Sequence, residues 1–248
     1  MNEVRDLESH GRLQFPAGYS YQNALKSAWL ILQDVVDRNN KPALEVCTQV
    51  SIANALMDMI IQGLSPAKKQ CYFIVRGNKL CLDRSYFGAI HVAKQVTNMV
   101  DIIAEVIRDG QDFEFDTHPK TGIKEMKKHV QPFNTLNNQI IGAYAIKKFA
   151  DGTYKMEIMT RDDIQKAWEQ GPMKGKSGAH LNFEGEMCKK TVINRACKIE
   201  INTSSDSDIV IAAVNRTIEG EYEDMRVNAE VNTVEETEEL ANTILGIK

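Results

Sequence analysis

The sequence predicts an α+β protein that has one core domain and an acidic C-terminal tail. Segments with helical spacing of apolar residues alternate with β-prone runs joined by turn dipeptides, which indicates helices combined with antiparallel hairpins. The 248 residues, of which 43% are hydrophobic, suffice for one sizeable core. We therefore divide the chain into an N-terminal helical segment (1–44), a core (45–218) and an acidic, partly flexible tail (219–248).

Two amphipathic helices are expected before the first strand. Residues 22–38 carry apolar side chains at helical spacing, and the polar run that follows, which contains Pro42, ends this predicted helix. A second helix is expected over residues 44–62, because Gly63 follows it and Pro66 lies just beyond, as is common at helix C-termini.

Residues 71–83 predict a β-hairpin, because two β-prone runs flank Gly77-Asn78, a strong two-residue turn signal. In that register one face is apolar and forms core, and it comprises Cys71, Phe73, Val75, Leu80 and Leu82. The other face is free for contacts, and it comprises Tyr72, Ile74, Arg76, Lys79, Cys81 and Asp83. Asp83 or Ser85 then caps a helix that runs to about residue 96.

Residues 101–159 are rich in β-prone runs, and Asp151-Gly152 gives a second two-residue hairpin signal. In that hairpin Lys148 lies directly opposite Lys155. Two like charges at such a position are unfavourable unless an anion lies across them.

The remaining elements are expected to be helical. A short helix is predicted over residues 161–169, followed by a mobile basic loop over 171–179. Longer helices are predicted over 183–201 and 206–218, and the tail holds a weakly amphipathic segment over 234–247.

The net charge of −4 hides a strong asymmetry along the chain. Residues 219–248 carry nine acids against two basic residues, so the rest of the chain is positive. Within that rest, 66–94 carry a net charge of +5 and 119–200 a net charge of +6. A basic body with an acidic tail suggests a polyanion-binding body, and acidic segments that can face basic surfaces, including those of identical neighbours.

Composition also argues against several classes of protein. The N-terminal residues show no basic region followed by an apolar run, and no segment approaches the roughly 20 apolar residues that cross a bilayer, so neither a secretory signal nor a membrane span is expected. The five cysteines lack CxxC spacing, and Cys188 and Cys197 are nine positions apart, which predicts opposite helix faces. A disulfide framework or zinc cluster is not expected, and a reducing cytosol fits.

Nucleotide chemistry has little support. The loop GPMKGKSG has too few residues between its glycines for a phosphate-binding P-loop, and it follows a predicted helix instead of a strand. Lys174 and Lys176 in this loop fit contact with a phosphate backbone or with solvent. The sequence contains no GxSxG, kinase-type or dinucleotide motif, so no nucleotide cofactor and no catalytic residue is predicted.

A metal-dependent nuclease is the alternative enzyme hypothesis. Acids that share one strand face, followed by an acid and a lysine on the next strand, can hold a divalent metal beside a scissile phosphate. The residues that would do so are Asp112, Asp116, Glu125 and Lys127. A half-buried strand with phenylalanines inside and acids outside explains the same pattern without a metal site.

Cations at regular spacing favour nucleic-acid binding. Lys190, Asn194 and Lys198 are four residues apart on the predicted helix 183–201, with Arg195 beside them, so they recur at about 6 Å intervals. This spacing is close to that of phosphates in an extended single strand, and Cys188, Val192, Ala196 and Ile199 gather on the opposite, core-facing side. Further cations or aromatics on three other elements suit a groove that follows a sugar-phosphate backbone. They are Tyr72, Arg76, Lys79, Lys127, Lys128, Lys147, Lys148 and Lys155.

Two segments resemble the RecT family of phage-type single-strand annealing proteins. GLSPAKKQCYFIVRGNKLCLDRSYFGAIHVAK (63–94) is similar to the family's Gly-Leu, Pro, aromatic-led hairpin and tyrosine-containing helix. FEGEMCKKTVINRACKIE (183–200) resembles its Glu-Met, Lys-Thr, Arg helix, here Glu186-Met187, Lys190-Thr191 and Arg195. The resemblance covers residues 45–215, and the turn departs from the family pattern, since Val75-Arg76-Gly77 replaces the common Pro-Tyr-Gly.

The resemblance implies an ATP-independent recombinase that coats single-stranded DNA, anneals it to a complementary strand and assembles into rings or helical filaments. It implies a small twisted antiparallel sheet packed by helices, no cofactor other than a possible effect of Mg²⁺ on annealing, and action in the cytoplasm of a bacterial host. The implied partners are single-stranded DNA, the annealed duplex and a phage 5′ to 3′ exonuclease, and for the tail we expect a host single-strand-binding protein. A nuclease and a passive single-strand-binding protein remain the alternatives.

Overall fold

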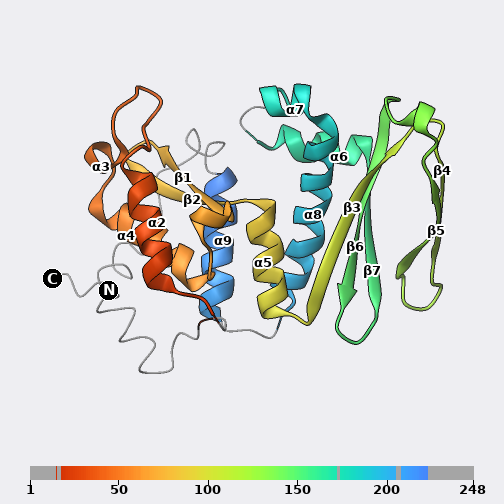
Figure 1. Ribbon diagram of the computed structural model, residues 1–248, viewed down its shortest axis with the longest axis horizontal. Helices are drawn as coiled ribbons and strands as arrows, with labels where there is room; N and C mark the ends of the chain where they lie inside the picture. The colour runs from red at the N-terminus through yellow and green to blue at the C-terminus, as the bar shows by residue number, and fades with distance from the viewer. Residues whose placement is uncertain (1–14, 16–17, 172–173, 205–207, 223–248) are drawn as a thin grey trace. The chain divides into compact units, whose positions relative to one another are not determined.

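The structure, a computed structural model, describes residue 15 and residues 18–171, 174–204 and 208–222. The chain divides into two compact units, which we describe separately (Figure 1). Unit 1 comprises residues 1–83 and 212–248, and unit 2 comprises residues 84–211. Both contain helices and antiparallel strands, which confirms the predicted α+β class. The boundaries predicted after residues 44 and 218 stay predictions, and the tail beyond Tyr222 lies outside the described residues.

Unit 1 combines helices with the first predicted hairpin. Its elements are α2 (Tyr21–Leu32), α3 (Ala43–Val46), α4 (Gln49–Ile61), the 3-10 helix η1 (Pro66–Lys68), β1 (Cys71–Arg76), β2 (Lys79–Arg84, which ends at the boundary) and the greater part of α9 (Asp208–Tyr222). The helix predicted over 44–62 is interrupted, because the Thr48 side chain caps α4 by accepting a hydrogen bond from the Ser51 N–H. The Thr48 N–H in turn donates to the Asn78 carbonyl, so the hairpin turn is held against this interruption.

The β1–β2 hairpin has the predicted faces. Cys71, Phe73, Val75, Leu80 and Leu82 are all buried, which confirms the expected core side. Gly77 has a φ of 61° while Asn78 is not left-handed, which is the φ pattern of a type II′ turn with glycine at its first central position.

Polar contacts join α9 to α4 within unit 1. Arg216 forms an ion pair with Asp58, and the buried Gln62 amide donates to the Thr217 hydroxyl at 2.8 Å. A buried amide needs such a partner, because an unsatisfied donor is costly to desolvate. These contacts connect residues that are far apart in the sequence.

Unit 2 holds the longer strands and the longest helix. Its elements are α5 (Tyr86–Val96), β3 (Met99–Arg108), β4 (Asp112–Thr117), β5 (Lys124–Val130), the 3-10 helix η2 (Phe133–Thr135), β6 (Ile140–Phe149), β7 (Tyr154–Thr160), α6 (Arg161–Glu169), α7 (Gly178–Asn182) and α8 (Glu184–Asn202). Ser85 caps α5 by accepting from the Gly88 N–H, as one of the two predicted capping residues. α6 matches its predicted bounds, and α8 is displaced by one residue from the predicted 183–201.

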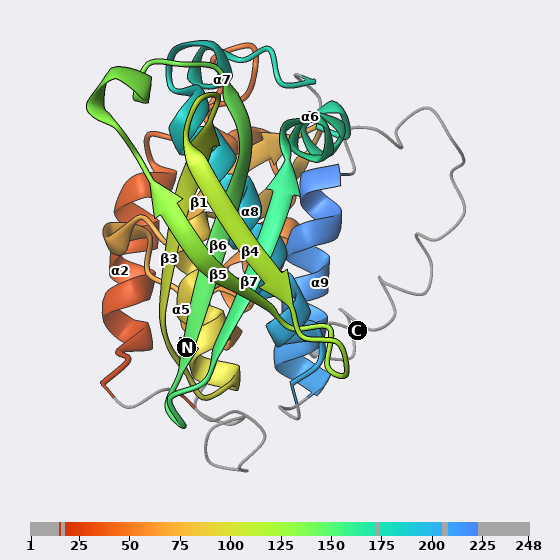
Figure 2. The same ribbon diagram turned by 90° about the vertical axis from the view of Figure 1, so that its right-hand side faces the viewer.

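Unit 2 is layered around a three-stranded antiparallel sheet of order β3-β6-β7. α5 and α8 lie on one side of this sheet, and the two-stranded β4–β5 hairpin lies over its other side (Figures 1 and 2). The hairpin is attached through aromatic side chains, since the Phe113 ring stacks on Tyr144 with 5.4 Å between centroids. Because side chains alternate along β6, residues 143, 145 and 147 face α8, whereas residues 144, 146 and 148 face the hairpin.

The turn between β6 and β7 corrects the predicted register. Lys147, and not Lys148, lies opposite Lys155, while Lys148 lies opposite Tyr154. The loop has one residue more than a two-residue turn, because the Phe149 N–H bonds the Thr153 carbonyl and Gly152 adopts a φ of 82°. Asp151 stabilises this longer loop by accepting from the Thr153 N–H at 2.9 Å.

Candidate nucleic-acid interface

α8 buries one side and exposes a row of polar and cationic residues on the other. Lys198 and Arg195 are exposed, and Lys190 and Asn194 are partly exposed, as the helical spacing predicts. One prediction for the other side is wrong. Ile199 is exposed, because the row that packs on the sheet passes through Ala196 to Glu200. Cys188 and Cys197 are both buried, because α5 and the sheet cover α8 together.

The cations of this row differ in their partners. Arg195 Nε lies 3.0 Å from Glu157 Oε1 on β7, which orients the exposed guanidinium. Lys190 and Lys198 have no ion-pair partner within the described part of the chain. Their ammonium groups are therefore available to an external anion. We call Lys190, Asn194, Arg195 and Lys198 the α8 row.

The basic loop before α7 lies near the N-terminal half of α8. A Cβ added at Gly175 would come within 3.1 Å of the Trp168 ring, so the loop lies directly against that indole. Trp168 Nε1 donates to Thr191 Oγ1 on α8 at 2.7 Å. Burial, and after it the positive charge of Lys190, lower the pKa of His180. Lys174 and Lys176 are exposed on this loop and extend the set of cations at this end of α8.

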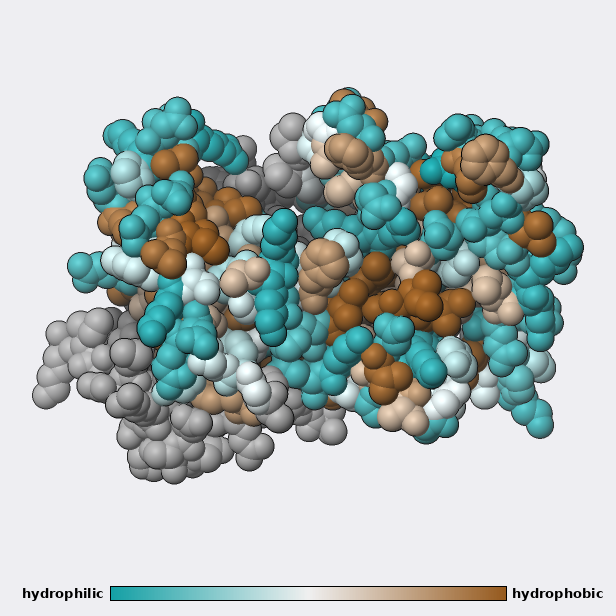
Figure 3. Space-filling view, viewed as in Figure 1, coloured by the Kyte–Doolittle hydropathy of each residue, from teal (hydrophilic) through white to brown (hydrophobic). Residues whose placement is uncertain are grey.

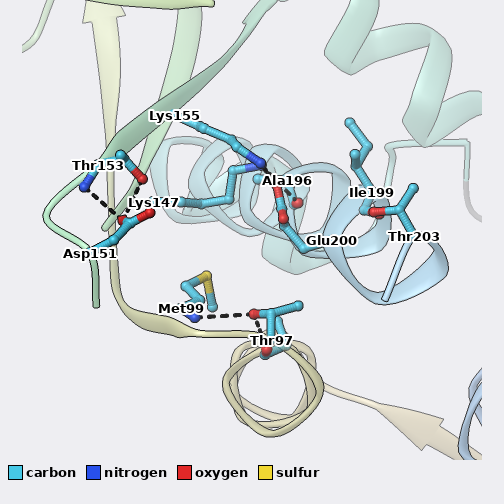
Figure 4. Close-up of polar contacts among 11 residues, drawn as sticks. Thr97, Met99, Lys147, Asp151, Thr153, Lys155, Ala196, Ile199, Glu200 and Thr203 are labelled. Carbon is cyan, nitrogen blue, oxygen red and sulfur yellow. Dashed lines mark hydrogen bonds and ion pairs between the residues drawn. The ribbon is translucent and has the colours of Figure 1, made fainter. Parts of the chain in front are cut away.

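Lys147 does not belong to an exposed interface. The residue is only 3% exposed, and its Nζ donates to Glu200 Oε1 at 2.8 Å and to the Ala196 carbonyl. Lys155 approaches the same carboxylate oxygen at 3.4 Å (Figure 4). The anion that the like-charge pair requires is thus Glu200, supplied by α8. Burial would raise the Glu200 pKa, but the hydrogen bond and charge of Lys147 outweigh it and hold the pKa low.

Arg76 also has a partner within the protein. Its guanidinium makes two parallel hydrogen bonds to the Asp83 carboxylate, of 2.8 and 2.7 Å, between β1 and β2. A bidentate pair of this kind leaves few donors for a phosphate. Tyr72 and Lys79 are exposed on the same face of the hairpin, as predicted, and they lie in unit 1.

The cations of the β4–β5 hairpin lie beside acids. Lys128 forms an ion pair with Asp112, and Lys127 lies 3.6 Å from Asp116 and 3.8 Å from Glu125. The nuclease hypothesis requires the acids to gather around a metal. Among the described residues no group of three or more His, Cys, Asp or Glu side chains is arranged to hold one. A bulge between Glu114 and Phe115 separates Asp112 from the other two acids along the hairpin.

Unit 2 brings together only part of the predicted set. α8 and the β4–β5 hairpin cover opposite sides of the sheet, so Lys127 and Lys128 do not share a groove with the α8 row. Lys148 faces the hairpin side, whereas Lys155 faces α8. Sequence reasoning missed Glu157, which pairs with Arg195, and Glu200, which pairs with Lys147 and Lys155. The signal that could have found them is an acid on the side of a strand or helix that packs against a cation.

Comparison with known proteins decides the family. A model of the RecT family matches residues 22–233, which is most of the chain. The chain belongs to the RecT family. It is also similar to Protein RecT of Escherichia coli (strain K12), with 28% identity over 201 residues that cover 73% of this chain and 72% of that protein.

RecT family membership supports a general role in DNA recombination and single-strand annealing, with DNA binding and self-association. The resemblance seen in residues 63–94 and 183–200 is thereby confirmed. None of the helices in the described ranges is both long and apolar enough to span a membrane.

Proposed function

We propose that this chain anneals complementary single-stranded DNA without ATP, acting as a homo-oligomeric filament or ring. The observation that carries the proposal is the α8 row, where Lys190 and Lys198 lack an internal anionic partner among the described residues of a RecT family chain. Phosphates of one strand neutralise these cations and release counterions. Base edges stay free, so a second strand is tested by Watson-Crick pairing, and no covalent bond is made or broken.

The partners and setting follow the same proposal. A phage 5′ to 3′ exonuclease supplies the single strand, the bacterial cytoplasm is the compartment, and a host single-strand-binding protein meets the acidic tail. Neither a nucleotide nor a resident metal takes part, and Mg²⁺ acts on annealing through the DNA. The exposed Tyr72, Lys79 and Lys155, with Lys127, Lys128 and Lys148, are secondary candidates for DNA contact.

The test is an annealing assay with two complementary oligonucleotides labelled as a fluorescence donor and acceptor. We expect the protein to speed duplex formation equally with and without ATP, at unchanged strand length. Strand shortening that EDTA abolishes would instead establish the nuclease built on Asp112, Asp116, Glu125 and Lys127. Protection of single strands without faster pairing would establish a passive binding protein.

The α8 row is tested by Lys190→Ala/Lys198→Ala. We expect weaker binding to oligothymidylate and a slope of log affinity against log salt that is smaller by about 1.4, since each phosphate contact on a single strand contributes about 0.7. Lys26→Ala/Lys41→Ala is the matched control, because both lysines are exposed in unit 1. Equal salt slopes for the two double variants would remove α8 from the interface.

A further inference from the structure

The side of the unit 2 sheet that faces the hairpin is covered only in part. The register aligns Glu105, Tyr144 and Ile158 in one row, and Phe113 stacks over this row. The next two rows toward the β6–β7 turn are Ile103-Ile146-Met156 and Asp101-Lys148-Tyr154. Ile103 is 67% exposed and Tyr154 is 55% exposed, so the described residues do not cover this end of the sheet.

The hairpin presents apolar side chains on its matching side. Phe115 is two residues beyond Phe113 on β4 and therefore shares its face, and it lies opposite Met126. Their exposed fractions are 40% and 38%. We call Ile103, Tyr154, Phe115 and Met126 the open apolar face, and Figure 3 shows apolar surface over the β3 region of unit 2. Clustered apolar residues on a surface mark sites of interaction.

The charges on this side favour an acidic partner. Lys148 lies on the same sheet face as Ile146, and Lys124 lies opposite Thr117 on the inner side of the hairpin. Neither lysine has an ion-pair partner among the described residues. Of the two acids on this sheet face, Asp101 lies 3.8 Å from Lys94, and Glu105 belongs to the row that the hairpin covers.

We propose that residues 234–247 of a second copy of this chain dock on the open apolar face. This segment combines apolar residues with a run of acids, which suits apolar side chains flanked by unpaired lysines. The apolar residues are Val234, Leu240, Ala241, Ile244, Leu245 and Ile247, and the acids are Glu235, Glu236, Glu238 and Glu239. The connecting residues 223–233 can span up to about 36 Å at roughly 3.3 Å per residue.

An apolar peptide fits this face better than nucleobases do. Ile103 and Met126 have no aromatic ring on which a base could stack, although Tyr154 and Phe115 do. The contact is heterologous, because it joins the tail of one copy to the face of the next. Each copy then keeps one free face and one free tail, so assembly continues into a ring or a filament. The proposed docking stands independently of annealing, because it needs no DNA.

The test uses two full-length variants and the mixture of both, with mass measured by sedimentation velocity without DNA. Ile103→Asp destroys the face but keeps the tail, and Leu240→Asp/Ile244→Asp destroys the tail but keeps the face. We expect each variant alone to have the mass of one chain, 27.9 kDa, while the wild type is larger. An equimolar mixture should form particles of two chains, because one intact tail meets one intact face and growth then stops.

The control is Leu181→Asp, since Leu181 is 72% exposed on α7, outside the open apolar face. It should keep the wild-type mass, and the far-UV circular dichroism spectrum of every variant should match the wild type. The proposal fails if Ile103→Asp keeps the wild-type mass or if the mixture stays monomeric. Loss of oligothymidylate binding in Ile103→Asp at unchanged mass would make this face a nucleobase surface and would also overturn it. An annealing assay run in parallel separates these failures from a failure of the proposed function.

Discussion

The two sides of the unit 2 sheet are held by different kinds of interaction. On the α8 side the small side chains of Ala143 and Ala145 allow close packing, and a buried ion pair joins Lys147 to Glu200. On the hairpin side the contact is aromatic, with Phe113 stacked on Tyr144 and in T-shaped contact with His129. One side therefore depends on a charge that must stay paired, and the other depends on rings that exclude water.

This difference explains why the proposed interface lies on α8. A buried charge tolerates little displacement of its partner, so the Lys147–Glu200 pair fixes the position of α8 on the sheet. The same helix presents Lys190 and Lys198 on its opposite side. A cation row that must follow phosphates at about 6 Å intervals benefits from a rigid support.

The largest loss of stability is expected when the buried ion pair on the α8 side is broken. Glu200→Ala leaves Lys147 buried without its carboxylate and should lower the free energy of unfolding of unit 2 by about 3–5 kcal/mol. Urea unfolding followed by Trp168 fluorescence in a Trp29→Phe background measures it, because Trp168 lies in unit 2 and Trp29 in unit 1. Lys147→Met/Glu200→Leu should regain most of this loss, since it buries no charge. A loss below about 1 kcal/mol for Glu200→Ala would show that water reaches the pair.

A smaller effect is expected on the aromatic side. Phe113→Ala removes the ring that lies on Tyr144 and should cost about 2–3 kcal/mol, less than a fully buried phenylalanine because Phe113 is partly exposed. The same urea unfolding experiment measures this loss of unfolding free energy. Phe133→Ala is the control, because this ring is almost fully exposed and its loss should change stability by less than about 0.5 kcal/mol. Equal losses for both variants would mean that the hairpin is not attached through Phe113.

The two hairpins show what local sequence can predict. Around Gly77-Asn78 the pattern predicted the core face correctly, because alternation and the turn type agree with the apolar core. Around Asp151-Gly152 it was wrong by one residue, because the Asp151 side chain stabilises a longer loop that the dipeptide does not distinguish. The observed register places Lys147 opposite Lys155, and Lys147 is buried whereas Lys148 is exposed.

The α8 row was predictable for a similar reason. Helical spacing depends on local geometry alone, so the exposure of Lys198 and Arg195 followed from the sequence. The partners Glu157 and Glu200 did not, because pairing with Arg195 and Lys147 depends on how α8 crosses β6 and β7. The open apolar face was equally hidden, since it depends on where the β4–β5 hairpin stops covering the sheet.

The smallest effect concerns pH and sharpens the contrast between the two sides. His129 Nε2 faces the Gln111 amide oxygen at 3.0 Å, and Nδ1 lies 3.0 Å from the Tyr144 hydroxyl, so the neutral ring donates to Gln111 and accepts from Tyr144. Burial lowers the pKa of His129, and the nearby Glu105 carboxylate opposes this only in part. The folded state therefore binds a proton less readily than the unfolded state, and stability should fall as the pH drops below about 6.5, the ordinary histidine value, until the folded pKa is passed.

His129→Gln should show a shallower decline in unfolding free energy between pH 7 and pH 5 than the wild type. Since burial also lowers the pKa of His180, the comparison is made in a His180→Gln background, where an unchanged pH profile would contradict the assignment.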